Sequence, residues 1–507
     1  MGRTKGYRRL VSWLGSRSAF RLIIGLFIVQ AGWIALSGRY PMAFDEDFHL
    51  GIIRLYAHHI SPFWSNQPAG ADIFGAVSRD PSYLYQYLMS FPYRLISVFT
   101  HDQTIQVLIL RFINIGLFVW GLTLYRQLLL KAGASRAVAQ ACLLVLVLIP
   151  IVPLLGAQIN YDNLILPLTA GVLLLTLHLD EELRVKKRLN LAVISELAIV
   201  GLLASLVKYA FLPILLAIAL FIAVRWWQYR RTVPLRSAVK ESWRRIGRKT
   251  RLGLGIGLIA ALGLFGQRYA VNLVRYHNPV PDCSQVLSIK QCSAYAPWIR
   301  DYDFALANVQ PLSGHHLRLT FTHTWLYGLW LRTFFAVDGP GTQFETRGPL
   351  LLPGLAAIVF AVIGGLALLS QAPKLFHRQG RPALWLFGLV SVLYLGALWQ
   401  DEYKAFVKTG QPVAINGRYL LPVLLLIFLL VAMSLNRLLK GRELLKAALL
   451  GAAVVCLVWG GGAMTYILRS NDSWYWPSPA IRHINYDIKS TLGPLTPGYH
   501  NYTQFLH

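Results

Sequence analysis

Ten long apolar segments constrain this chain more than any other feature of its sequence. Most are close to the roughly 20 residues that an α-helix needs to cross the hydrocarbon core of a bilayer. Only 14% of the 507 residues are charged, whereas about a quarter are charged in a typical soluble domain. The sequence therefore predicts an all-α, polytopic helical membrane protein. The apolar segments cover residues 20–37, 104–127, 137–156, 163–180, 191–224, 252–271, 350–370, 382–399, 419–436 and 447–468.

Lysine and arginine residues cluster between these segments and predict how the chain is oriented. The positive-inside rule places such clusters in the cytoplasm. The net charge of +27 is then explained by topology, and a nucleic-acid partner is not expected. The clusters lie in the N-terminal tail and near residues 131–136, 184–188, 225–251, 374–381 and 437–446.

One apolar segment, 191–224, does not fit a single crossing. Its 34 residues would form a helix about 50 Å long against a hydrocarbon core of about 30 Å. A single crossing would also place the basic cluster 225–251 outside. Two short helices that turn around Lys208 and Tyr209 remove both conflicts. The expected topology has about eleven spans in an inner or plasma membrane, with the N-terminus in the cytoplasm and the C-terminus outside.

The predicted outer loops contain polar residues and amphipathic segments whose presence the positive-inside rule does not explain. Segments 46–60 and 82–99 have the pattern of amphipathic helices that contact membrane lipids at the interface. The long outer loop at about 272–349 contains Cys283 and Cys292, which are close enough in sequence to bridge. A disulfide is expected there if the loop faces an oxidising compartment.

Three consecutive carboxylates, Asp45, Glu46 and Asp47, follow the first apolar segment. Adjacent carboxylates at a membrane surface repel one another, so they need water, cations or a site that uses them. Asp45 and His49 are spaced for one face of a helix, with Glu46 beside them. A carboxylate held partly out of water can act as a general base, and several carboxylates suit a divalent cation. The alternative is that Asp45 only caps a helix that begins near Glu46.

Two other polar positions lie at or within the apolar segments. Arg111 is inside the second segment, where an arginine costs at least about 2.5 kcal/mol on insertion. We expect it to face protein and to pair with Asp162 or Asp45. Asp162 is expected either to join the polar site or to cap the span that starts near Asn163. The adjacent histidines at 58–59 and 315–316 lack ligand spacing, so a metal role is expected for His49 and not for them.

The sequence FDEDFHLG at 44–51 resembles the acidic signature in the first outer loop of the glycosyltransferase C superfamily, and protein O-mannosyltransferases have a very similar string. The sequence NYD at 160–162 resembles a second acidic position of these enzymes. LVKY at 206–209 lies where members often have Lys-Tyr or Lys-Pro at an outer turn. NGRYLLP at 416–422 resembles a string before a late span in poorly characterised bacterial members. These motifs cover roughly residues 20–437, so residues 1–437 are expected to form the catalytic module, with 438–507 adding a last span and an outer tail.

This resemblance implies an inverting transferase that moves a sugar from a polyprenyl phosphate or diphosphate to an acceptor hydroxyl on a glycan, lipid or protein. Asp45 and Glu46 would be catalytic, with Asp45 as the base or as the carboxylate that orients the acceptor, and the resemblance leaves open which of the two is the base. A divalent metal cation, if the enzyme uses one, would be held by Asp45, Glu46, His49 and Asp162. Lys208 and Arg418 would neutralise the departing phosphate, because both lie where spans emerge. The full set of supporting or substrate-binding residues that the resemblance implies is His49, Asp162, Lys208, Arg418, Arg79 and Tyr419.

Two other functions use related chemistry. A transporter or flippase of lipid-linked sugars would place ionisable residues near the bilayer midplane, often in repeated halves. This chain instead concentrates its polar residues at one face and shows no internal repeat. An O-antigen polymerase or ligase would share the donor, but we would expect an arginine-rich outer loop in place of the early acidic cluster.

Overall fold

The computed structural model describes residues 2–43, 45–308, 315–334, 337–338, 346–347, 351–376, 381–460 and 462–495. Over these residues the chain is helical apart from connecting segments and one small antiparallel pair, β1 (Val337–Asp338) and β2 (Thr346–Arg347), in which Val337 faces Arg347. Helices suit an apolar chain because each satisfies its own backbone hydrogen bonds without water. The predicted all-α membrane fold is confirmed.

Nine helices among the described residues are long and apolar enough to cross a membrane. Two shorter apolar helices, α6 (Arg136–Val147) and α9 (Leu191–Val207), occupy the other two predicted positions. Nine of the eleven expected spans therefore have full length. The nine are α2 (Arg17–Ser37), α5 (Gln103–Lys131), α8 (Asp162–Arg184), η2 with α10 (Tyr209–Phe211, Leu212–Tyr229), α12 with the π-helical η3 and α13 (Arg248–Phe265, Gly266–Ala270, Val271–Tyr276), α18 (Leu351–Leu375), α19 (Pro382–Thr409), η4 with α20 (Gly417–Leu420, Leu421–Leu438) and α21 with α22 (Glu443–Gly460, Gly462–Arg469).

The predicted break within 191–224 is confirmed. Helix α9 ends at Val207, and Lys208 has an extended backbone with φ −152° and ψ 120°. The single turn η2 then leads into α10, which has Pro213 in its first turn, where a missing N–H costs no helical hydrogen bond. The turn brings Lys208 to the end of the bundle where α9 stops.

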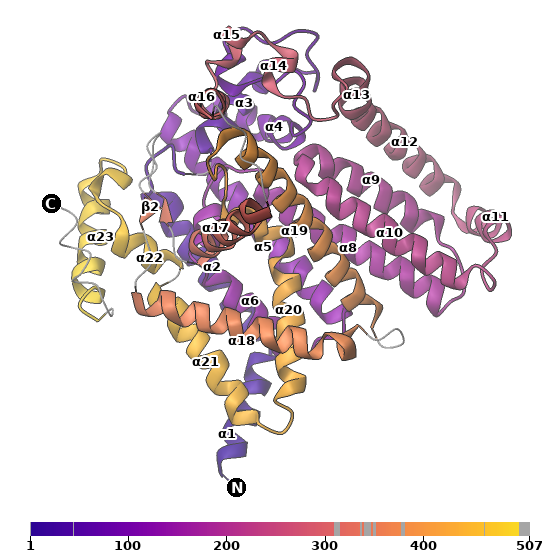
Figure 1. Ribbon diagram of the computed structural model, residues 1–507, viewed down its shortest axis with the longest axis vertical. Helices are drawn as coiled ribbons and strands as arrows, with labels where there is room; N and C mark the ends of the chain where they lie inside the picture. The colour runs from indigo at the N-terminus through magenta and orange to yellow at the C-terminus, as the bar shows by residue number, and fades with distance from the viewer. Residues whose placement is uncertain are drawn as a thin grey trace.

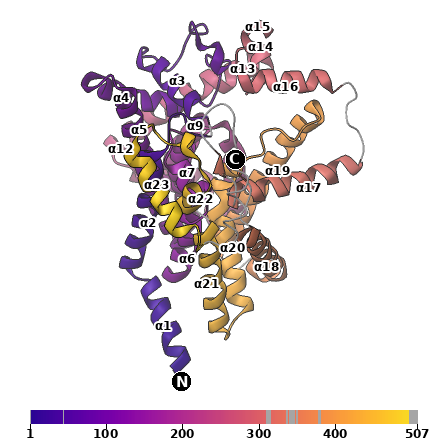
Figure 2. The same cartoon turned by 90° about the vertical axis from the view of Figure 1, so that its left-hand side faces the viewer.

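The remaining elements are helices outside the nine spans, and several of them lie near the ends of the spans (Figures 1 and 2). Helices α3, α4 and α14–α16 gather at one end, and α1 leaves the bundle at the opposite end. These elements are α1 (Gly2–Leu14), α3 (Glu46–Ala57), η1 (Ala71–Phe74), α4 (Leu84–Phe99), α7 (Ile151–Gly156), α11 (Leu235–Arg245), α14 (Cys283–Val286), α15 (Ile289–Cys292), α16 (Ala296–Ala307), α17 (His315–Phe334), η5 (Asp472–Trp474) and α23 (Pro479–Leu492).

Residues of three basic clusters meet at the end opposite to α3. Lys131, Arg184 and Arg381 come from three different predicted cytoplasmic clusters, and together they line one cavity of about 310 Å³. The predicted outer ends of α2, α8, α9 and α20 meet at the other end, where the polar motifs lie. The helices therefore alternate in direction as the charge pattern predicts, and the cytoplasmic assignment of the basic end remains a prediction.

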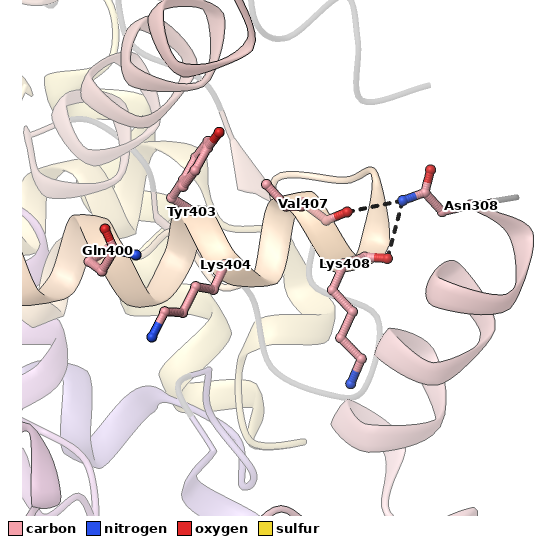
Figure 3. Close-up of a pocket in the computed structure, with 6 residues that line it drawn as sticks. All are labelled: Asn308, Gln400, Tyr403, Lys404, Val407 and Lys408. Carbon is pink, nitrogen blue, oxygen red and sulfur yellow. Dashed lines mark hydrogen bonds between the residues drawn. The ribbon is translucent and has the colours of Figure 1, made fainter. Parts of the chain in front are cut away.

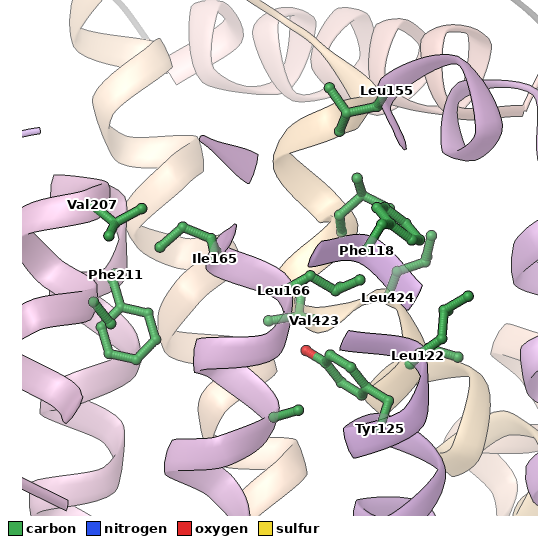
Figure 4. Packing of buried hydrophobic residues seen from close by; sticks show 14 of the residues in the cluster. Phe118, Leu122, Tyr125, Leu155, Ile165, Leu166, Val207, Phe211, Val423 and Leu424 are labelled. Atoms are coloured by element: carbon green, nitrogen blue, oxygen red, sulfur yellow. The ribbon is translucent and has the colours of Figure 1, made fainter. Parts of the chain in front are cut away.

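The packed centre of the molecule surrounds α5. Figure 4 shows Phe118, Leu122 and Tyr125 of α5 facing side chains of α8 and α20. All three are fully buried, and the Tyr125 hydroxyl donates a hydrogen bond of 2.7 Å to the carbonyl of Pro422. This contact ties α5 to the start of α20, four residues after Arg418.

Gly417 lies where α17 crosses the start of α20, and its missing side chain permits that crossing. A Cβ at position 417 would lie 2.5 Å from the Thr333 backbone nitrogen, so the backbone itself would have to move. We expect Gly417→Ala to destabilise the protein by about 1–3 kcal/mol through overpacking. Gly396→Ala on α19, where a Cβ meets nothing within 4 Å, is the matched control. Thermal unfolding of both purified variants tests this, and equal melting temperatures would contradict it.

Candidate active site

Glu46 forms a buried ion pair with Arg111 of α5. Arg111 Nε lies 2.8 Å from Glu46 Oε1 and Arg111 Nη2 lies 2.7 Å from Oε2, with both side chains fully buried. Glu46 also accepts hydrogen bonds from the backbone nitrogens of Met42 and Ile159. The expected pairing of Arg111 with Asp162 or Asp45 is therefore wrong. Each carboxylate oxygen of Glu46 thus accepts two hydrogen bonds and the side chain is fully buried, which leaves little capacity to bind a substrate or a metal.

The remaining donors of Arg111 bind the end of α2. Its Nη1 donates to the carbonyls of Ala35 at 2.9 Å and Gly38 at 2.6 Å. Carbonyls in the last turn of a helix have no helical partner, so a guanidinium is a suitable cap. One arginine thus connects α2, α5 and the start of α3. These contacts fix the chain on both sides of Asp45 and so the direction in which its side chain projects.

Asp45 occupies the residue before α3 but does not cap the helix. Its backbone is left-handed, with φ 68° and ψ 31°, and its side chain makes no capping hydrogen bond. The capping alternative is therefore wrong. Asp45 Oδ2 instead accepts a hydrogen bond of 2.6 Å from Arg418 Nη2 of η4, and its side chain is 44% exposed while that of Arg418 is 7% exposed. Burial alone would raise the pKa of Asp45, but the charge and hydrogen bond of Arg418 outweigh it and lower the pKa.

Asp162 and Lys208 form a second ion pair beside the first. Lys208 Nζ lies 2.6 Å from Asp162 Oδ1, and both side chains are almost completely buried. Asp162 is the first residue of α8 and not its cap, which is Tyr161. Its second oxygen, Oδ2, has no hydrogen-bond partner within the described residues. This buried carboxylate oxygen retains the capacity to accept a further hydrogen bond.

Two tyrosines lie between the ion pairs. The Lys208 ammonium lies 4.6 Å from the centre of the Tyr161 ring and 4.9 Å from that of Tyr419. The guanidinium of Arg418 lies 5.3 Å from the Tyr419 ring. Aromatic faces stabilise cations without neutralising them. The two cations therefore remain available to an anion while their positions are fixed.

His49 packs against Tyr161 and so helps to hold this tyrosine in place. It is buried, and its ring meets that of Tyr161 edge-on at 4.5 Å. Its Nδ1 donates to the side-chain oxygen of Gln86 at 3.1 Å when the Gln86 amide is oriented so that its nitrogen faces the carbonyls of Ser82 and Tyr83. Burial lowers the pKa of His49 to about 3, so the ring is neutral at physiological pH.

The four expected metal ligands are not grouped together within the described part of the chain. Among the described residues, no three or more His, Cys, Asp or Glu side chains are grouped to hold a metal ion. Of the four expected ligands, Glu46 is enclosed by Arg111 and Asp162 is bound to Lys208. The side chains of residues 315–316 lie outside the described residues.

Arg79 and Arg268 belong to a neighbouring part of the same end. Arg268, which was not among the expected site residues, is fully buried, and its guanidinium donates to the backbone carbonyls of Ser78 and Pro62. It lies in the π-helical turn η3, and such turns often occur at functional sites. Arg268 therefore holds the loop that includes Arg79. Its only signal in the sequence is an arginine near the end of a span.

Tyr295 is a site residue for which the sequence gives no signal. It follows the disulfide between Cys283 and Cys292, and its backbone nitrogen donates to the carbonyl of Cys292 at 3.0 Å. Its ring lies 6.1 Å from that of Phe48. Burial raises the pKa of Tyr295, and the charges of Asp45 and Asp80 add to this effect. Tyr295 thus covers the space between α3 and the loop of Arg79.

A surface pocket of about 390 Å³ lies between α16 and the end of α19 (Figure 3). Its wall includes Asn308, whose side-chain nitrogen donates to the carbonyls of Val407 and Lys408 at 3.1 and 3.2 Å. None of the expected site residues lines this pocket. The pocket is therefore separate from the cluster formed by the two ion pairs.

Comparison with known proteins gives a weak structural likeness only. No protein-family model matches the chain, and no curated protein matches its sequence. Crystal structures of the Archaeoglobus fulgidus oligosaccharyltransferase are similar, one in complex with Zn and sulfate (14% identity, TM-score 0.43) and one tethered to an acceptor peptide with an NVT sequon (13%, 0.42). The oligosaccharyltransferase AglB of that organism with an inhibitory peptide and a dolichol-phosphate gives 13% and 0.44.

These matches cover 94%, 92% and 97% of this chain but only 56%, 59% and 60% of the archaeal chains. The chain thus spans less than two thirds of their length. TM-scores below 0.5 do not establish a shared activity, so the function is inferred below from the side chains of the site.

The Glu46–Arg111 pair predicts a large loss of stability when one partner is removed. We expect Glu46→Gln to destabilise the protein by about 3–5 kcal/mol, because Arg111 would keep a buried, uncompensated charge. Asp47→Asn, at the adjacent exposed position, is the control. Thermal unfolding in detergent measures the difference. The double variant Glu46→Gln, Arg111→Met should recover part of the loss. If its loss of stability equals the sum of the losses in the two single variants, the pairing is contradicted.

The neutral state of His49 predicts a pH dependence of stability. In the unfolded chain His49 binds a proton below its ordinary pKa of 6.5, whereas in the folded protein it stays neutral down to about pH 3. Stability therefore falls as pH decreases through this window, by about 2 kcal/mol between pH 6.5 and 5. His49→Gln should flatten that part of the stability curve, while His58→Gln at an exposed position should leave it unchanged. Identical curves for His49→Gln and the parent protein would show that His49 is not responsible.

Proposed function

We propose that this protein is a membrane glycosyltransferase that moves a sugar from a polyprenyl-phosphate or polyprenyl-diphosphate donor to an acceptor hydroxyl at the extracytoplasmic face. The observation that carries the proposal is the Asp45–Arg418 pair beside Lys208. A half-exposed carboxylate and two cations are held within one cluster at the ends of several spans. Such a cluster supplies a base for the acceptor and a counter-charge for a phosphate leaving group.

Asp45 is the proposed base. Its lowered pKa keeps it ionised, and its exposed oxygen can accept the proton of an acceptor hydroxyl. The acceptor oxygen then bonds to the anomeric carbon of the sugar. The bond between that carbon and the phosphate oxygen breaks, and the phosphate leaves with the electron pair. A single displacement of this kind inverts the configuration at the anomeric carbon.

Arg418 and Lys208 are proposed to bind the phosphate as its charge increases. A guanidinium has five N–H donors, so Arg418 can keep its bond to Asp45 while it donates to a phosphate oxygen. Lys208 keeps Asp162 as a partner and faces the two tyrosine rings. Each cation is balanced by a carboxylate before substrate binds, which limits the cost of burying it.

The lipid part of the donor needs an apolar path, and α4 offers one. The inner face of this helix packs on the protein, and the opposite face exposes Leu88, Phe91, Leu95, Val98 and Phe99. An amphipathic helix of this kind lies in the membrane interface. The proposed donor chain would run along this lipid-facing region, with its phosphate at Arg418 and Lys208. The acceptor and the sugar are left open by this geometry.

Removal of the Asp45 carboxylate tests the proposed base. We expect Asp45→Asn to reduce the rate of transfer from a polyprenyl-phosphate sugar by about 10²–10⁴-fold, the usual contribution of general-base catalysis. Asp47→Asn should retain the parent rate, because Asp47 is exposed and takes no part in the two ion pairs. Transfer by purified protein in lipid nanodiscs, measured with a radiolabelled donor, gives the rates.

Three outcomes of this assay are distinguishable. Loss of transfer with an unchanged melting temperature supports the base. Undiminished transfer by Asp45→Asn would remove Asp45 from the mechanism. Movement of intact lipid-linked sugar between leaflets, without any transfer by the parent protein, would replace the proposal with a flippase.

A further inference from the structure

Arg79 is a buried cation for which the described residues supply no hydrogen-bonding or ionic partner to the side chain. The residue is only 7% exposed, and its Nη1 is fully buried with no hydrogen bond. Over the described chain, its side chain takes part in no hydrogen bond or ion pair. A buried charge in this state is costly, and proteins normally retain one only when something outside the chain completes it.

The loop that includes Arg79 is fixed beside the proposed active site. Asn272 of α13 donates to the Arg79 carbonyl at 2.9 Å. Three residues further on, the Ser82 hydroxyl accepts a hydrogen bond of 3.0 Å from the backbone nitrogen of Tyr209, which follows Lys208. Three residues span at most about 10 Å. The backbone of Arg79 is therefore held near the corner that positions Lys208, and a long side chain can cover the remaining distance.

The charges at this end of the molecule are unevenly distributed. Lys208 and Arg418 each have a carboxylate at 2.6 Å. Arg268 is satisfied by two backbone carbonyls, and its guanidinium lies 4.5 Å from the Tyr83 ring. Asp80 is the carboxylate closest in sequence to Arg79, but it accepts from the Ser82 backbone, and burial raises its pKa despite the charge of Arg268. Of these four cations, Arg268 and Arg79 have no carboxylate partner among the described residues, and Arg79 also lacks the side-chain hydrogen bonds that Arg268 makes.

We propose that Arg79 binds a second phosphate of the donor, so that the donor is a sugar on a polyprenyl diphosphate. This inference rests on the proposed function, because it takes Lys208 and Arg418 as the site of the phosphate next to the sugar. The bond that breaks is the one between the anomeric carbon and the oxygen of that phosphate. The diphosphate leaves with the electron pair, and Arg79 meets the extra negative charge that a monophosphate would not have. Free pyrophosphate shares this chemistry, so the experiment includes it.

Binding of farnesyl diphosphate, farnesyl phosphate and inorganic pyrophosphate to the full chain in nanodiscs tests the proposal. We expect the parent protein to bind farnesyl diphosphate more tightly than farnesyl phosphate. Arg79→Gln should weaken farnesyl diphosphate binding by about 10- to 100-fold, the range for one charge-assisted hydrogen-bonding group, and change farnesyl phosphate binding by less than about 3-fold. Arg275→Gln, at an exposed arginine of the same end, should change neither.

The stability of the ligand-free protein separates binding from a structural role. If Arg79 serves a ligand, Arg79→Met should melt at the same temperature as the parent or higher, because an uncompensated charge is removed. A lower melting temperature for both Arg79→Met and Arg79→Gln would instead indicate a structural arginine and would overturn the proposal. Arg79→Lys should restore part of the affinity for farnesyl diphosphate.

Other outcomes overturn the proposal in identifiable ways. Equal weakening of farnesyl phosphate and farnesyl diphosphate by Arg79→Gln would show that there is no second phosphate site. Pyrophosphate that binds as tightly as farnesyl diphosphate would assign the site to a free anion. Loss of transfer in Asp45→Asn with unchanged diphosphate binding in Arg79→Gln would leave the glycosyltransferase proposal intact and assign a monophosphate donor.

Discussion

The structure depends on one buried ion pair, Glu46 with Arg111. A guanidinium inside a membrane protein needs a fixed anion, and Glu46 supplies one with two parallel hydrogen bonds. Because Arg111 also binds the last carbonyls of α2, the chain must turn sharply between α2 and α3. Asp45 then takes a left-handed backbone and extends toward Arg418. A structural carboxylate thereby positions an adjacent functional one.

The site joins segments that are far apart in the chain. Asp45 and Arg418 are separated by 373 residues, and Asp162 and Lys208 by 46. Each of the four lies where a helix begins or ends, and the alternation of the spans brings these ends to one face. The tyrosines at 161 and 419 fill the space between the two pairs. Two neutral ion pairs packed against these tyrosine rings can accept a phosphate with little rearrangement, since each cation keeps its carboxylate.

Much of the fold could be predicted from the sequence, because bilayer thickness and charge bias act on every segment. The break at Lys208 followed from the length of segment 191–224 and from the basic cluster that follows it. Residues near span ends, such as Asp162 and Arg418, could be assigned to one face, and the structure brings them together. Pairing could not be predicted: three adjacent carboxylates look equivalent, and only the packing of α5 shows that Glu46 binds Arg111. Tyr295 and Arg268 were missed because contacts with distant loops leave no periodic pattern in the sequence.

The most direct test of the central claim is a cryo-EM structure of the protein in nanodiscs with a non-hydrolysable polyprenyl-linked sugar phosphonate. The proposed function predicts phosphonate density within hydrogen-bond distance of Arg418 and Lys208, with the anomeric carbon facing the exposed oxygen of Asp45. Density at the opposite, basic end of the bundle, or along the spans away from Asp45, would contradict it.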